Sequence, residues 1–234
     1  MKWPQTLTIV RHGESTFNKM KEEIRKTPEY VEFNKLFTKE FEAASSIDWP
    51  SAKLISMATS VWQKTKQNIS DYHTLLTEEG VRQSVVTGQK LKDQITLPDQ
   101  IYVSPHKRTR QTLDGLMKGW PELKKVRCIP DDRIREQEYG LQTVFNDWRV
   151  YCTLNPIQGL LFKQDGDYMY RHSNGESKTD VRDRLRSFMS TLIREDSGEN
   201  VLLVSHHLTL LSIRANLERW TPEKFLEVDK GEKV

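Results

Sequence analysis

Short apolar runs recur along the chain, separated by longer stretches with helical periodicity. Four of these runs have the length and β-branched content of buried strands: residues 6–10, 100–105, 126–130 and 201–205. Between them, apolar positions recur every three or four residues, which is typical of amphipathic helices. Apolar strands that alternate with helices indicate a mostly parallel sheet covered on both faces. The pattern therefore predicts an α/β fold, a three-layer α/β/α sandwich.

The region after the first predicted strand departs from this alternation. A charged helix is expected to begin at Pro28, with Tyr30, Phe33 and Phe37 on its apolar side, and a second helix is expected over 51–69. We interpret residues 19–75 as a helical insertion and expect it to cap the strand ends. The alternative is an ordinary helical pair packed elsewhere on the sheet. A length of 234 residues suits one large domain, 1–234, that contains this insertion.

Later segments are read in the same way. Thr77 precedes two acidic residues and predicts the N-cap of a helix. A helix is also expected around residues 144–154, another after Gly175-Glu176-Ser177, and two more after the last strand. Residues 155–175 are rich in Gly, Asp and aromatic residues, and the pattern assigns no element to them.

Composition narrows the classes of function. Thirty-six basic residues face 33 acidic ones, for a net charge of +3, and no basic run with interleaved aromatic residues appears, so we expect no nucleic-acid partner. No apolar run approaches the roughly 18 residues that span a bilayer, and the N-terminus shows no signal-peptide core, so a cytoplasmic location is expected. Cys128 and Cys152 are widely spaced, which predicts reduced thiols and neither a disulfide framework nor a metal site.

The candidate chemistry lies where strands end or in the loops that follow. These positions are Arg11 and His12, Arg108, Glu136, and His206. If the strands are parallel neighbours, the side chains converge at one edge of the sheet. Two arginines and two histidines around one point suit an oxyanion, and phosphate best of all, because guanidinium groups bind phosphate oxygens bidentately.

Each of these residues has a plainer alternative. Arg108 could be a solvated helix charge like Lys107 or Arg110, and His206 could be a hydrogen-bonded core histidine. Glu138 competes with Glu136 in the same loop. Gly13, directly after His12, allows either a tight turn or a close approach of the backbone. The remaining histidines, His73, His106, His172 and His207, are interpreted as surface groups or as groups one step removed from a ligand.

Six motifs together resemble one family. They are RHGESTFN at 11–18, LTEEGVRQ at 76–83, SPHKRTRQT at 104–112, REQEYG at 135–140, GES at 175–177 and VSH at 204–206. In this order they resemble the landmarks of the histidine phosphatase superfamily, the phosphoglycerate mutase-like proteins. Three features depart from its pattern. His207 replaces a small residue found in many relatives, the insertion is long, and the closing strand of many relatives is absent, short or cut off.

The resemblance implies a role for each matching position. His12 would attack phosphorus and form a covalent phosphohistidine, while Arg11, Arg108 and His206 hold the phosphoryl oxygens. Asn18 would add a neutral donor to the same phosphate. Glu136 would protonate the leaving oxygen and later activate water. The resemblance implies no metal and no cofactor, because the cationic side chains neutralise the phosphate.

These observations favour a phosphatase acting on a phosphorylated small molecule. A phosphoglycerate mutase is the first alternative, and the residues after Glu136 lack the GLNK and paired-arginine features that we associate with mutases. A protein phosphatase is another alternative, because the insertion could offer a docking surface. The last is a non-catalytic protein that binds phosphorylated ligands on the same fold. The insertion could equally form the interface of a homodimer.

Overall fold

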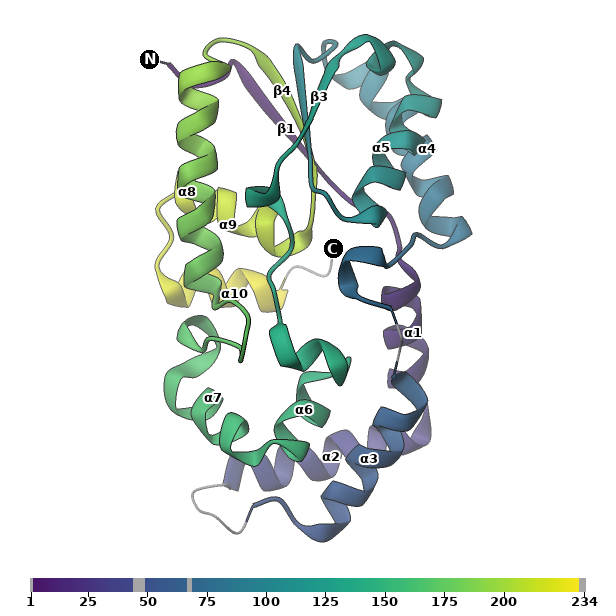
Figure 1. Cartoon of the computed structure of the whole chain (residues 1–234), viewed down its shortest axis with the longest axis vertical. Helices are drawn as coiled ribbons and strands as arrows, with labels where there is room; N and C mark the ends of the chain where they lie inside the picture. The colour runs from purple at the N-terminus through teal and green to yellow at the C-terminus, as the bar shows by residue number, and fades with distance from the viewer. Residues whose placement is uncertain (1, 44–48, 67–68, 232–234) are drawn as a thin grey trace. The chain divides into compact units, whose positions relative to one another are not determined.

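The chain divides into two compact units, which we describe separately (Figure 1). The computed structural model describes residues 2–43, 49–66 and 69–231. The first unit combines Met1–Thr16, Asp71–Gln137 and Lys178–Val234, and the second combines Phe17–Ser70 and Glu138–Ser177. Each unit is therefore assembled from segments that are far apart in the sequence.

In the described residues, the first unit is built on a four-stranded sheet whose paired strands are all parallel. The strands are β1 (Thr6–Arg11), β2 (Gln100–Val103), β3 (Arg127–Pro130) and β4 (Asn200–Ser205), in the spatial order β1-β4-β2-β3. All four lie where the apolar runs predicted them. The last strand pairs with the first, with Arg11 opposite Ser205. The ends of β1, β4 and β2 therefore lie next to one another.

Alternating side chains of the two central strands, β2 and β4, are buried on both faces of this sheet. Ile101 and Val103 pack in one core cluster with α5 (Lys107–Gly119), whereas Tyr102 points the other way and its ring lies 5.2 Å from Phe188 of α8 (Lys178–Glu195). Successive residues of a strand face opposite sides, so a short strand without polar residues needs a helical layer on each face. This explains why the runs are apolar throughout.

Those helical layers are visible in Figure 1. The helix α4 (Glu78–Gln94) lies with α5 on one side of the sheet, and α8 and α9 (His207–Leu217) lie on the other. The three-layer α/β/α arrangement predicted from the sequence is thus present in the first unit. Three 3₁₀ turns join these elements: η1 (Asp71–His73), η2 (Pro121–Lys125) and η3 (Asp132–Ile134). Thr77 caps α4 as expected, because its hydroxyl accepts the Gly80 N–H at 3.0 Å.

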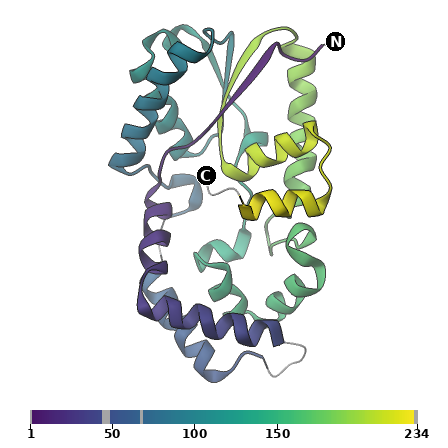
Figure 2. The ribbon, with the colours of Figure 1, turned by 180° about the vertical axis from the view of Figure 1, so that it is seen from behind.

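The first unit ends in a helix, α10 (Pro222–Gly231), which contacts α9 (Figure 2). Asp229 of α10 accepts bonds from Lys178 at 3.0 Å and from His207 at 3.2 Å. His207 therefore ties α10 to the start of α9. No further strand follows β4 in the part of the chain that the structure describes, which stops at residue 231.

In its described residues, the second unit is helical. Its elements are α1 (Thr16–Arg25, whose first residue belongs to the first unit), α2 (Pro28–Ala43), α3 (Ala52–Thr65), η4 (Gly140–Val144), α6 (Trp148–Leu154) and α7 (Pro156–Met169). The insertion is thus helical as predicted, and α2 begins at Pro28. The periodicity did not predict α1, and it assigned nothing to the segment that forms α7. Gly166, at φ 74°, interrupts α7. The expected role as a cap stays a prediction.

Aromatic side chains hold the two segments of the second unit together. Phe33 and Phe37 of α2 share a buried cluster with Tyr151 of α6. Polar contacts also cross between the segments: Tyr30 donates to Asp147 at 2.7 Å, Trp62 to the Val144 carbonyl at 2.9 Å, and Asn146 to the Thr65 carbonyl at 2.6 Å. Residues 138–177 therefore complete a core that the insertion cannot close alone. No helix in the described residues is long and apolar enough to cross a membrane.

Candidate active site

Three adjacent strand ends of the first unit bring the candidate residues together. His12 follows β1, His206 follows β4 and Ser104 follows β2. The ladder continues one step beyond the strands, because the His12 N–H donates to the Ser205 carbonyl and the Ser104 N–H to the Val204 carbonyl, both at 3.0 Å. The His12 and His206 rings consequently lie edge to face, with centroids 5.2 Å apart. Ligands of parallel sheets bind at this end of the strands.

His12 is held as a neutral imidazole with one nitrogen committed. Its Nδ1 lies 2.8 Å from the Gly13 carbonyl oxygen, which can only accept, so Nδ1 carries the proton and Nε2 carries the lone pair. Burial lowers the pKa of His12 to about 3, and the charges of Arg108 and Arg11 act in the same direction. The imidazole is therefore neutral across the physiological pH range, with the lone pair of Nε2 on the side of Arg108.

Arg108 faces the nucleophilic nitrogen. Its Nε–H points at His12 Nε2 from 3.2 Å. The side chain is 4% exposed, whereas Lys107 and Arg110 on the same helix are exposed. Burial thus separates Arg108 from its basic neighbours and removes the interpretation as a solvated helix charge.

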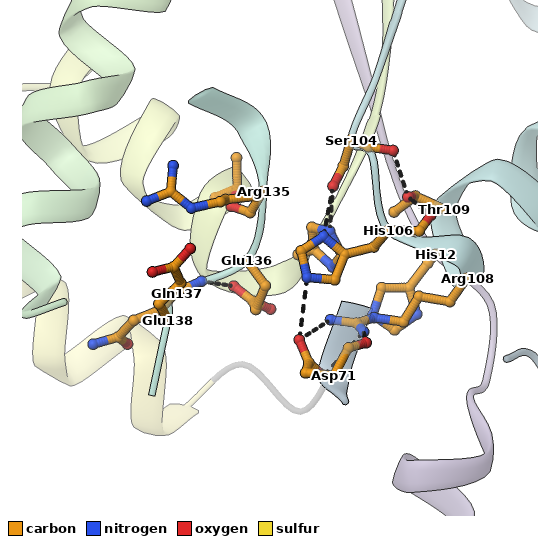
Figure 3. A network of polar contacts seen from close by, with 12 residues as sticks. His12, Asp71, Ser104, His106, Arg108, Thr109, Arg135, Glu136, Gln137 and Glu138 are labelled. Atoms are coloured by element: carbon orange, nitrogen blue, oxygen red, sulfur yellow. Dashed lines mark hydrogen bonds and ion pairs between the residues drawn. The ribbon is translucent and has the colours of Figure 1, made fainter. Parts of the chain in front are cut away.

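A carboxylate that the sequence analysis missed binds the end of the Arg108 guanidinium. Asp71 of η1 accepts Nη1 at 3.0 Å on Oδ1 and Nη2 at 3.1 Å on Oδ2, and its backbone carbonyl accepts Nη1 at 2.7 Å (Figure 3). This fork occupies the Nη1–Nη2 end of the group and leaves the Nε side turned to His12. Burial alone would raise the pKa of Asp71, but hydrogen bonds from His106 and Arg108 hold it well below its ordinary range. Asp71 lies in a three-residue turn outside every motif, so no sequence signal marked it.

The loop that carries Glu136 is fixed by its backbone. Donors from three elements bind its carbonyl oxygens: Arg184 of α8 at residues 133, 135 and 136 (2.5, 2.9 and 3.1 Å), Ser205 of β4 at residue 134 (2.6 Å) and Thr209 of α9 at residue 135 (2.8 Å). Buried carbonyl groups need such partners. The loop is therefore positioned as firmly as the strands are.

The surroundings of Glu136 favour the protonated form of its carboxyl. Burial raises the pKa of its carboxyl, against the opposing charge of Arg108. Figure 3 shows the carboxyl turned toward the group formed by His12, Asp71 and Arg108. Glu138, the competing candidate, is exposed, belongs to the second unit, and exchanges two backbone-directed hydrogen bonds with Glu176. A carboxyl with a raised pKa beside cations is suited to proton transfer.

Burial also shifts the pKa values of the two remaining candidate residues, Arg11 and His206. Burial lowers the pKa of Arg11, with Glu136 opposing and Arg108 adding to the shift. His206 is fully buried, and burial followed by the charge of Arg108 lowers its pKa well below the ordinary value. Its Nε2 lies 2.7 Å from Ser104 Oγ. Its Nδ1 is buried and has no hydrogen-bond partner among the residues that the structure describes.

The motif at 76–83 supports the loop after His12. A Cβ on Gly13 would overlap the carbonyl oxygen of Gly80, and a Cβ on Gly80 would overlap that of Glu14, so the two backbones touch directly. Thr77 donates to the Glu14 carboxylate at 2.6 Å, and the Glu14 N–H donates to Gln83 at 2.9 Å. Gly13 therefore serves close packing against α4 at this position.

The predicted site residues separate into two groups. Arg11, His12, Arg108, Glu136 and His206 all lie in the first unit, at or just beyond the strand ends. Asn18 lies in α1 of the second unit, and its contact with phosphate stays a prediction. His106 is buried with its ring centroid 4.7 Å from that of His206, and so lies one step from the site, whereas His73 is exposed.

Comparison with known proteins gives concordant matches. The family model described as the histidine phosphatase superfamily (branch 1) matches residues 58–232. The phosphoglycerate mutase-like protein AT74H of Arabidopsis thaliana is 30% identical over 175 residues, which cover 66% of this chain and 60% of that protein's length. The broad-range acid phosphatase DET1 of Saccharomyces cerevisiae is 25% identical in an alignment that covers 95% of this chain and 81% of DET1. The solved structure of the alpha-ribazole phosphatase from Shigella flexneri matches with a TM-score of 0.63 at 16% identity and covers 94% of this chain and 83% of that one.

Proposed function

This chain belongs to the histidine phosphatase superfamily (branch 1), and on that premise we propose that it hydrolyses phosphomonoesters through a phosphohistidine formed on His12. The observation that carries the proposal is the state of this imidazole. Gly13 fixes its tautomer, burial keeps it neutral, and its Nε2 lone pair accepts a hydrogen bond from Arg108 Nε at 3.2 Å, a donor that a phosphoryl oxygen would take over. A neutral, oriented nucleophile beside a fixed cation is what attack on a phosphate ester needs.

In the first step, His12 Nε2 attacks phosphorus in line with the ester oxygen. The N–P bond forms as the P–O bond to the leaving group breaks, and the leaving oxygen takes the proton of the Glu136 carboxyl. The raised pKa of Glu136 supports this role, because burial favours the protonated form of the carboxyl that donates. The products of this step are the alcohol, the phosphohistidine and a carboxylate at Glu136.

In the second step, water resolves the intermediate. The Glu136 carboxylate takes one proton from a water molecule, whose oxygen attacks phosphorus as the P–N bond breaks. Inorganic phosphate leaves, and both His12 and Glu136 return to their starting forms. One carboxyl thus serves as acid and then as base, which requires it to stay beside the phosphoryl group, and the backbone bonds from Arg184 and Ser205 support such a fixed position.

Electrostatic stabilisation falls to Arg11, Arg108 and His206. Phosphoryl transfer depends mainly on positioning and on neutralising the equatorial oxygens. Because Asp71 holds the end of the Arg108 guanidinium, the Nε side is the part presented to a phosphoryl group on His12. We expect these groups to suffice without a metal ion. The substrate class proposed is a phosphorylated small molecule.

A panel of phosphate esters tests this function directly. Wild type and His12→Ala are incubated with p-nitrophenyl phosphate, alkyl phosphates and phosphoglycerates, with and without EDTA, and quenched in base. We expect wild type to carry acid-labile phosphate and to release free phosphate. EDTA should reduce neither amount. Isomerised phosphoglycerate would instead identify a mutase. If neither free phosphate nor isomerised phosphoglycerate forms, the protein only binds phosphorylated ligands. Activity that EDTA abolishes and added metal restores would contradict the metal-independent mechanism.

A further inference from the structure

A line of hydrogen bonds leads from His206 away from His12 to Asp71, through Ser104 and His106, to which the proposed mechanism gives no role. Ser104 Oγ lies 2.7 Å from His206 Nε2 and 3.3 Å from His106 Nδ1. His106 Nε2 in turn lies 3.2 Å from Asp71 Oδ2 (Figure 3). Ser104 and His206 are fully buried, and His106 is 7% exposed. Such a buried chain has few allowed arrangements of its protons.

Asp71 fixes one end of this chain. Although burial opposes it, hydrogen bonds from His106 and Arg108 lower the pKa of Asp71, so the carboxylate is ionised and can only accept. His106 Nε2 must therefore carry a proton. The remaining freedom is at His106 Nδ1, which either accepts a hydrogen bond from Ser104 or, when His106 is protonated, donates one.

Each choice determines the tautomer of His206. If His106 is neutral, the Ser104 hydroxyl donates to it and accepts from His206 Nε2–H, which leaves His206 Nδ1 as a bare lone pair. If His106 is protonated, the Ser104 hydroxyl accepts from it, and His206 Nε2 is then the one acceptor in the described residues for the buried hydroxyl proton, so that the proton of neutral His206 lies on Nδ1. A serine hydroxyl allows both arrangements, because it rotates to suit its partners.

We propose that His106 is a positioning residue, held by Asp71, whose protonation selects through Ser104 which nitrogen of His206 carries the proton. The charges around the two rings support this division. His206 experiences the charges of Arg108 and Arg184 as well as the neighbouring His12 and His106 rings, which disfavour a further cation on it. His106 faces the Asp71 carboxylate, whose Oδ2 also accepts from Arg108 Nη2 at 3.1 Å, and the Tyr72 ring, whose centroid lies 5.4 Å away, in addition to His206. A positive charge on His106 would therefore lie next to a carboxylate, whereas one on His206 would lie among these cations and rings.

The consequence for ligands concerns His206 Nδ1, the buried nitrogen without a hydrogen-bond partner in the described residues. With His106 protonated, Nδ1 offers an N–H to a phosphoryl oxygen; with His106 neutral, it presents a lone pair that repels one. This consequence rests on the proposed function, because it assumes that the anion bound beside His12 is a phosphoryl group. The coupling between His106 and His206 does not depend on the proposed function.

Nitrogen NMR of histidine side chains tests the coupling without any turnover. In ¹⁵N-histidine-labelled wild type, the protonated nitrogen of His206 should change from Nε2 to Nδ1 as the pH is lowered, with the same midpoint as the titration of His106. In His106→Gln the amide can bridge Asp71 and Ser104 but cannot gain a proton, so His206 should stay protonated at Nε2 at every pH. A wild-type His206 that keeps one tautomer while His106 titrates would overturn the proposal, and so would a switch that persists in the variant.

Binding of inorganic phosphate tests the consequence. Below the midpoint of His106, His106→Gln should bind phosphate roughly 10- to 100-fold more weakly than wild type, as expected for one lost hydrogen bond to an anion. Above the midpoint the two proteins should agree within about twofold, and His73→Gln, at an exposed histidine of η1, should match wild type throughout. A ratio of affinities that does not change with pH would contradict the role at phosphate. A tautomer switch in a protein that forms no phosphohistidine would overturn the proposed function and leave the coupling intact.

Discussion

The two compact units bury different kinds of side chain. At the strand ends, the first unit encloses Ser104, His106, Arg108 and His206, each less than a tenth exposed and most of them hydrogen-bonded to one another. The core of the second unit instead combines buried aromatic rings of α2, α6 and Trp49 with aliphatic side chains of α3. Burying polar groups lowers the stability of the folded protein, and in the first unit the proposed catalytic role accounts for their presence. Burial of apolar rings in the second unit instead raises stability. Substitutions in the two units should therefore fail in different ways.

The largest effect on catalysis short of removing the nucleophile is expected at Arg108. Arg108→Ala removes the cation that faces His12 Nε2 and should lower kcat for p-nitrophenyl phosphate by about 10³- to 10⁵-fold. Arg110→Ala, on the same helix but exposed, is the matched control and should retain wild-type kinetics. Steady-state kinetics of both variants make the measurement. If both variants lost kcat equally, burial would not distinguish the function of Arg108 from that of Arg110.

The second unit should respond in stability. Phe33→Ala deletes a fully buried ring from the aromatic core and should lower the free energy of unfolding by about 3–5 kcal/mol. Ile157→Ala, at a side chain that is 79% exposed in the same unit, should change it by less than about 0.5 kcal/mol. Urea denaturation measures both. Below its melting temperature, Phe33→Ala should keep kcat for p-nitrophenyl phosphate within a few-fold of wild type. A loss of kcat as large as that of Arg108→Ala would contradict the view that the second-unit core contributes stability alone.

The substitution Glu136→Gln should lower activity but raise the free energy of unfolding at high pH. Glu136→Gln should lower kcat/KM for alkyl phosphates by about 10²-fold, and for p-nitrophenyl phosphate less, because that leaving group needs no proton. Since burial raises the pKa of Glu136, the folded protein binds this proton more tightly than the unfolded chain does. The associated stability is present at low pH and is lost as pH rises through the raised pKa.

Above that pKa, Glu136→Gln should therefore be more stable than wild type, and wild-type activity should fall as the pH rises through the same pKa. Thermal melts and pH–rate profiles of the two proteins make the measurement, with Glu138→Gln as the control at an exposed carboxyl of the same loop. A variant that is no more stable than wild type at alkaline pH would show that burial does not disfavour the Glu136 carboxylate.

The smallest effect tests how the second unit joins its two segments. Tyr30→Phe removes the hydroxyl that donates to Asp147 at 2.7 Å and should cost about 1–2 kcal/mol of stability, because it leaves a buried carboxylate oxygen without that donor. Burial and the neighbouring Asp147 raise the pKa of Tyr30 to about 12. Burial also raises the pKa values of Tyr102 and Tyr170, so ultraviolet titration should find one fewer late-ionising tyrosine in the variant than in wild type. An unchanged titration would show that the contact between segments is absent in solution.

The sequence predicted the parts of the molecule whose signals are local. Buried strands are short apolar runs, and Arg11, His12 and His206 follow such runs directly, so the sheet and most of the candidate site were predictable. The burial of Arg108 separates it from its neighbours in the way that its motif position suggested. These features depend on residues within one element and on the parallel arrangement of the strands.

What could not be predicted depends on contacts between distant segments. Asp71 gains its importance from Arg108, 37 residues later in the chain, and no pattern around Asp71 announces it. The ring of His106 is turned toward Ser104 and Asp71 by the packing around it, although histidine in that motif position carries no such signal. The segment that forms α7 lacks a clear apolar stripe and contains Gly166 at positive φ, so its helix is evident in the fold but not in the periodicity.

The most direct test of the account is to locate the phosphoryl group on the protein. In Glu136→Gln supplied with p-nitrophenyl phosphate, the first step needs no proton from residue 136, while the second lacks its base, so the phosphoenzyme should accumulate. Quenching in base, proteolysis and mass spectrometry should place acid-labile phosphate on the peptide that contains His12, and the double variant with His12→Ala should carry none. Phosphate found on another residue, or hydrolysis that continues after His12→Ala, would contradict the central claim.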